Sequence, residues 1–169
     1  MPKVIIIFAL LLSALFAEEE LETFPFLGIT ASYHQIDFDS SAKLDDNKET
    51  LLGFRYGKQT LDWRTMFTLL GDNNIQNFSV ELEIDKILLD DMFGYPEVRP
   101  YLGATIGYTH NESNDLQDSD GVYYGGAFGF LIYITDNIDA DISYHYNKLE
   151  DIEPLSATKG VSIGIHYFY

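Results

Sequence analysis

Cysteine is absent from this chain of 169 residues. The absence excludes disulfide bonds, thiolate metal sites and cysteine nucleophiles. Small exported domains often depend on disulfides for their stability. This chain therefore has to be held together by non-covalent contacts alone.

Basic residues are scarce. Ten Lys and Arg residues stand against 27 Asp and Glu residues, which gives a formal net charge of -17. Binding to phosphate backbones requires the opposite sign of charge. Nucleic acid is therefore excluded as a partner.

Long hydrophobic runs are also missing beyond the N-terminus. No later segment approaches the roughly 18 consecutive apolar residues of a transmembrane helix, and the mean hydropathy is -0.06. A membrane β-barrel has an equally modest average, because only alternate residues face lipid. The 12 Tyr and 12 Phe residues are plentiful enough for interfacial aromatic belts.

The N-terminus has the pattern of a secretory signal peptide over residues 1–17. Lys3 precedes an apolar run at residues 4–12, and small residues lead to Ala17, although Leu15 stands where a small residue is preferred. The run is too short to span about 30 Å of hydrocarbon, so a membrane anchor is not favoured. We predict a signal peptide (1–17), a short periplasmic N-terminal segment (18–24) and a β-barrel (25–169).

Alternating apolar and polar residues predict eight strands, each near the length that a tilted strand needs to cross a bilayer. A soluble sandwich would show the same alternation. The polar faces, however, consist of Gly, Thr and Ser on some strands and of charges of both signs on others, which favours a narrow closed interior. The predicted strands are residues 26–36, 50–57, 61–69, 77–86, 101–109, 122–134, 138–146 and 159–169.

The predicted connections differ in length, with tight turns at 57–60 and 135–137. The longer connections are mostly acidic or Asn-rich, as in outer-membrane barrels with short periplasmic turns, long outer loops and both termini in the periplasm. The connection 87–100 departs from this pattern. Residues 115–121 faintly resemble a calcium loop, but Leu116 interrupts the ligand series, so a solvated acidic loop is favoured. The long loops are 37–49, 70–76, 110–120 and 147–158.

Charged residues on the inward faces predict a network of ion pairs. Arg55 is expected opposite Asp62, and Arg64 opposite Glu83 if their hairpin is centred on residues 73 and 74. Around the turn at Asp136, Leu131 is expected opposite Asp141. Opposite charges across strands are stabilising, and an unpaired charge inside a barrel is costly. The full predicted lumen network is Arg55, Asp62, Arg64, Glu81, Glu83, Asp139 and Asp141.

The last strand resembles the C-terminal assembly signal of bacterial outer-membrane barrels at Ser162, Gly164, Tyr167 and Tyr169. With the signal peptide, the eight strands and the segment 100–108, the chain resembles the small outer-membrane β-barrel families, namely the OmpA-type transmembrane domain and OmpX-like proteins. The resemblance covers nearly the whole mature chain but specifies architecture, not activity. The peptidoglycan-binding domain of full-length OmpA proteins is not expected here.

This resemblance implies an all-β fold, an eight-stranded antiparallel up-and-down transmembrane β-barrel in the outer membrane. It also implies a monomer without cofactors or metals. The implied partners are outer-membrane lipid, lipopolysaccharide and, through the last strand, the barrel assembly machinery.

The expected role is that of a non-enzymatic envelope or surface-interaction protein. Lipid A deacylases of this size use a His-x-Ser pair on the outward face, and neither His110 nor His145 begins such a pair. Ser143 and His145 share a face, but that face is predicted to be the lumen. His34 and His166 are expected to be polar lumen residues. A narrow ion or solute pore is the alternative, and a lipid A-modifying enzyme is the second alternative.

Overall fold

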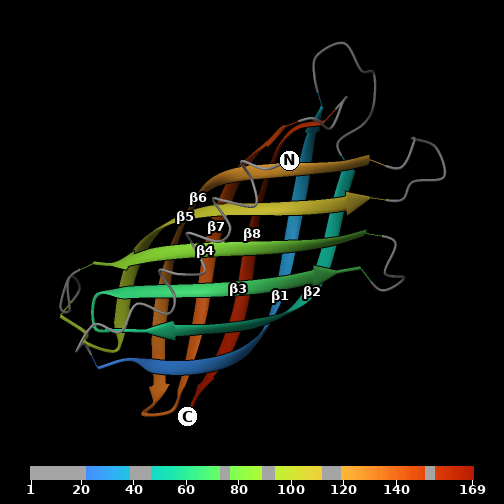
Figure 1. Cartoon of the computed structure of the whole chain (residues 1–169). Helices are drawn as coiled ribbons and strands as arrows, with labels where there is room; N and C mark the ends of the chain where they lie inside the picture. The colour runs from blue at the N-terminus through green and yellow to red at the C-terminus, as the bar shows by residue number, and fades with distance from the viewer. Residues whose placement is uncertain (1–21, 39–46, 73–76, 89–93, 112–118, 151–154) are drawn as a thin grey trace.

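A computed structural model shows eight antiparallel strands that close into a barrel (Figure 1), as predicted. It describes residues 22–38, 47–72, 77–88, 94–111, 119–150 and 155–169. No helix in these ranges is long and apolar enough to span a membrane. The strands are β1 (Phe24–Phe38), β2 (Asn47–Gln59), β3 (Trp63–Gly71), β4 (Asn77–Ile87), β5 (Val98–Asn111), β6 (Ser119–Thr135), β7 (Ile138–Glu150) and β8 (Leu155–Phe168).

Closure depends on β1, which pairs with both β2 and β8. Gly28 of β1 lies opposite Arg55 on one side and opposite His166 on the other. The sheet therefore has no open edge, and its backbone groups are hydrogen-bonded within the barrel, as a hydrocarbon environment requires. The end of β8 lies beside the turn between β6 and β7 (Figure 1), where the Phe168 amide donates to the carbonyl of Asn137.

Most of the strands are longer than predicted, so several of the expected loops are shorter. β1 continues to Phe38 and β7 to Glu150, while β8 begins at Leu155. The predicted ends followed the apolar stripe, but backbone pairing continues beyond it. The centres of these loops, at 39–46, 112–118 and 151–154, lie outside the described residues, as does the predicted signal peptide.

The tight turn after β2 also differs from its prediction. β2 continues to Gln59, and the turn forms at residues 60–62, where the amide of Thr60 donates to the carbonyl of Trp63. The long connection after β4 lies at the same end of the barrel. Ile87 at its start is buried against Tyr101, Ala127 and Leu131, so this apolar cluster fills the lumen at the end that carries the turns.

The outer face carries the apolar side chains that the alternation predicted. Phe54 is 71% exposed and Ile163 is 59% exposed. Such a continuous apolar surface is far larger than the patches that soluble monomers expose, and it fits contact with hydrocarbon. Exposed aromatic residues stand toward both ends of the barrel, as expected for interfacial belts: Tyr56, Trp63, Tyr167 and Tyr169 at the turn end, and Tyr33, Phe78, Tyr108, Tyr124 and Tyr146 at the loop end.

Candidate functional site in the barrel lumen

Glycines leave the space in which large side chains fill the lumen. A Cβ atom at Gly129 would lie 2.6 Å from ring atoms of Tyr101, and one at Gly107 would lie 2.2 Å from the ring of Tyr123. Both tyrosines are buried. A barrel of eight strands is only just wide enough for its own side chains. The glycines on the inward faces of β5 and β6 therefore provide the space that the bulky tyrosine rings occupy.

Asp141 of β7 is the centre of a buried ion-pair network. Its Oδ2 lies 2.7 Å from Nη1 of Arg64 and 3.3 Å from Nη1 of Arg55. The hydroxyl of Tyr101 donates to Oδ1 over 2.9 Å. These partners come from β2, β3 and β5, so a single carboxylate links distant walls of the barrel.

Arg64 is fully buried and binds two carboxylates. Besides Asp141, its Nε donates to Oδ2 of Asp85 over 2.7 Å. The guanidinium carbon also lies 4.6 Å from the centroid of the Tyr101 ring, within the range of a cation–π contact. Asp85 was on the predicted inward face of β4 but not in the predicted network. Which residue Asp85 pairs with depends on the register between β3 and β4. The alternation of apolar and polar residues does not determine that register.

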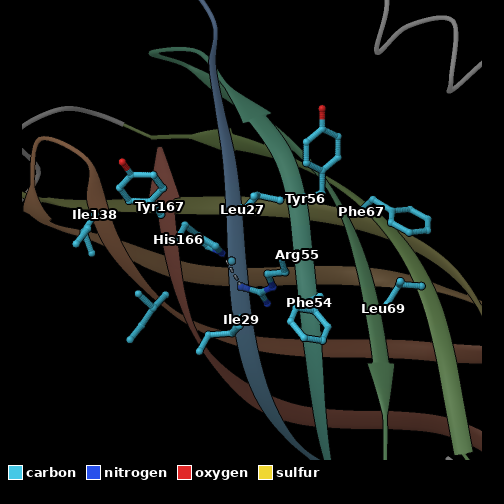
Figure 2. Close-up of a pocket in the computed structure, with 12 residues that line it drawn as sticks. Leu27, Ile29, Phe54, Arg55, Tyr56, Phe67, Leu69, Ile138, His166 and Tyr167 are labelled. Carbon is cyan, nitrogen blue, oxygen red and sulfur yellow. Dashed lines mark hydrogen bonds between the residues drawn. The ribbon is translucent and has the colours of Figure 1, made fainter. Parts of the chain in front are cut away.

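Asp139 and His166 extend the network toward β8. His166 Nδ1 and Asp139 Oδ1 are 2.7 Å apart, and His166 Nε2 is 3.4 Å from Nη1 of Arg55. Figure 2 shows this last contact as a dashed line, with the apolar residues Phe54 and Tyr167 on the same two strands and Leu27 on β1 between them. The prediction that His166 is a bonded lumen residue is confirmed. His34 is partly buried near the loop end.

Two predicted ion pairs are wrong. Arg55 lies opposite Thr68 rather than Asp62. Asp62 is in the turn, where its exposed carboxylate pairs with Lys86 over 2.9 Å. The turn after β2 is three residues later than expected, which explains the first error.

The second error concerns Arg64, which lies opposite Asp85, while Glu83 lies opposite Met66. The hairpin is centred one residue later than expected, which shifts the pairing by two. The remaining predicted register, with Leu131 opposite Asp141, is confirmed.

A second polar cluster contains Glu81 and Glu83 of β4, both buried. Tyr123 donates its hydroxyl proton to Glu81 over 3.1 Å, and Thr105 donates to Glu83 Oε2 over 3.3 Å. His145 of β7 reaches the same place from another wall, with its Nδ1 3.6 Å from Glu83 Oε2.

Sequence reasoning missed the set formed by Ser143, His145 and Glu83. Ser143 Oγ is 2.8 Å from His145 Nε2, and the opposite ring nitrogen faces Glu83. A serine, a histidine and a carboxylate in this order resemble a nucleophile with its base and orienting acid. Ser143 is only 3% exposed and lies among buried residues, so a lipid substrate has no access to it. Ser143 and His145 are two residues apart on β7, so alternation placed them on one face of the strand. No local sequence pattern indicates that this face lies near Glu83 of β4.

The four residues predicted to form the assembly signal divide between the lumen and the outer face at the end of the chain. Ser162 and Gly164 face the lumen, where Ser162 Oγ is 2.7 Å from Ser32 Oγ. A Cβ atom at Gly164 would lie 2.7 Å from Nη1 of Arg55. Tyr167 and Tyr169 are exposed on the outer face. In the folded barrel, Gly164 thus leaves room for the ion-pair network.

At the loop end, Asp120 pairs with His110 on the neighbouring strand. The Asp120 side chain is 55% exposed, so this pair lies at the open rim of the barrel.

Over residues 6–167, the chain is similar to the outer membrane protein beta-barrel domain family. No curated protein matches the sequence.

The solved structures that share the fold include the following three. Neisserial surface protein A is 18% identical with a TM-score of 0.61, covering 86% of this chain and 97% of that chain. Outer membrane protein H from P. aeruginosa is 19% identical with a TM-score of 0.63, covering 86% and 99%. A de novo designed transmembrane β-barrel is 13% identical with a TM-score of 0.51, covering 86% and 95%. Because a designed barrel has the same architecture, the fold by itself assigns no activity.

Proposed function

Because this chain belongs to the outer membrane protein beta-barrel family, we propose that it is a non-enzymatic, monomeric barrel with a role in envelope structure or surface interaction. The observation that carries the proposal is the closed lumen. Asp141 and Arg64 connect β3, β4, β5 and β7 across the interior, and both side chains are fully buried. A lumen filled in this way offers neither a passage for solutes nor a pocket for a substrate.

The proposal is tested by conductance measurements on the refolded chain in planar lipid bilayers. We expect no stable open channel, because the buried ion pairs would have to separate before ions could pass. A larger porin in the same bilayer is the control that shows the assay detects openings. Large, long-lived openings of the wild-type chain would favour the pore instead.

In this proposal the acidic loop end faces the outside of the cell and both termini lie in the periplasm. The support is the position of the exposed Asp120 at the rim opposite the turns and the shorter turns at residues 60–62 and 136–137. Exposed carboxylates there would meet lipopolysaccharide through bridging divalent cations, or meet a surface ligand. The barrel assembly machinery would recognise β8 through Ser162, Gly164, Tyr167 and Tyr169 before the strand is closed against β1.

The absence of cysteine allows a direct test of this orientation. Glu150 is exposed at the loop end, and Asp136 is exposed at the turn end. A membrane-impermeant maleimide is expected to label Glu150→Cys in intact cells and to label Asp136→Cys only after the outer membrane is opened. The reverse pattern would invert the topology, and labelling of neither position in intact cells would contradict a loop end on the cell surface.

A further inference from the structure

We propose that the lumen binds one divalent transition-metal ion, best represented by Zn²⁺, through Glu81, Glu83 and His145. One ligand atom from each of these residues lies within 4.8 Å of the others, and all three residues are buried. Tetrahedral zinc with bonds of about 2.0–2.2 Å needs ligand atoms roughly 3.4 Å apart. The 3.6 Å between His145 Nδ1 and Glu83 Oε2 is already close to that value.

The contacts around the three side chains resemble the outer shell of a metal site. Ser143 Oγ lies 2.8 Å from His145 Nε2. If that nitrogen carries the ring proton and donates it to Ser143, the lone pair of Nδ1 points toward the carboxylates. Metal-bound histidines usually have this arrangement, with the second ring nitrogen donating to a neighbour. Thr105 and Tyr123 donate hydrogen bonds to the carboxylates of Glu83 and Glu81.

The mutual repulsion of neighbouring buried carboxylates supports the proposal. Glu81, Glu83 and Asp85 are all buried on β4, and the Glu83 carboxylate interacts with both of the others. In the described part of the chain, Glu83 Oε1 and Asp85 Oδ1 have no partner other than each other's carboxyl. Such buried carboxylates are costly, and a bound cation would reduce their repulsion.

The charge balance of the lumen points the same way. The buried charged residues comprise five carboxylates and two arginines. The arginine ion pairs involve Asp85 and Asp141, and Asp139 pairs with His166. A divalent cation between Glu81 and Glu83 would offset most of the remaining negative charge.

The donor set favours zinc over the other common cations. Calcium and magnesium prefer oxygen ligands alone, whereas one imidazole with two carboxylates suits a borderline metal such as Zn²⁺. Three protein ligands leave a fourth position for water. Because β4 and β7 are not neighbours in the sheet, the ion would connect two separate walls of the barrel. This role goes beyond the proposed function and does not depend on the surface ligand.

The test uses the chain without a histidine tag, which is treated with a chelator in the unfolded state and then refolded in detergent in the presence of ZnCl₂ or MgCl₂. After buffer exchange, elemental analysis is expected to find one zinc per chain and no bound magnesium, and zinc is expected to raise the urea midpoint. A folded wild-type chain that retains no zinc would overturn the proposal.

Variants separate the lumen from adventitious surface binding. His145→Gln and Glu81→Gln are expected to abolish zinc retention, while the matched surface variant His110→Gln retains one equivalent. Ser143→Ala is expected to weaken zinc affinity about 10–100-fold, because it removes only the partner of the second ring nitrogen. Retention of a full equivalent by folded His145→Gln would also overturn the site. If His145→Gln does not fold, the proposal is tested instead by zinc retention in Glu81→Gln and by the Co²⁺ absorption spectrum of the wild type.

Discussion

Replacing Arg64 by methionine is expected to destabilise the barrel by about 3–5 kcal/mol, the usual cost of removing one partner from a buried ion pair. Arg64 is fully buried and binds both Asp85 and Asp141. The substitution keeps most of the side-chain volume but leaves two carboxylates short of a partner. Urea unfolding of the refolded protein in lipid vesicles measures the loss.

The matched control is the exposed pair of Asp62 and Lys86, whose side chains are 69% and 39% exposed. Asp62→Asn is expected to cost no more than about 1 kcal/mol, because exposed ion pairs contribute little. Adding Asp85→Asn to Arg64→Met is expected to recover part of the stability, since it removes one of the uncompensated charges. A loss below about 1 kcal/mol for Arg64→Met would show that the network does not hold the lumen together.

An arginine in place of Ile142 is expected to cost about 2–4 kcal/mol in a bilayer, the penalty for a charge at the midplane of a lipid-facing surface. Ile142 is 46% exposed and lies on the outer face of β7, midway between Ile138 and Tyr146. In a soluble protein a charge at such an exposed position would be nearly neutral. The measurement is the free energy of unfolding in vesicles.

Leu61→Arg provides the comparison at a different depth. Leu61 is 69% exposed in the turn between β2 and β3, at the level where a charge costs about 0–1 kcal/mol. Equal losses for the two variants, or no loss for Ile142→Arg, would mean that the outer stripe does not face hydrocarbon.

Register was predicted correctly at one tight turn, and wrongly at the tight turn after β2 and across the longer connection between β3 and β4. The turn at Asp136 and Asn137 leaves β6 and β7 little freedom, and Leu131 pairs with Asp141 as expected. The connection between β3 and β4 is longer, and the pairing there shifted by two residues. Such a shift leaves every side chain on its original face, so alternation cannot detect it. Arg64 consequently faces the lumen as predicted, but with Asp85 as its partner.

The residue pattern by itself determined the number of strands, the face to which most strand side chains point and the apolar outer surface, because strand geometry has a period of two residues. Closure of the sheet determined which side chains contact one another across the lumen. Asp141 contacts Arg55 and Arg64, and His145 faces Glu83, from strands that are not neighbours in the sheet. Contacts across the lumen depend on the curvature and stagger of the closed sheet, and a local sequence pattern contains neither.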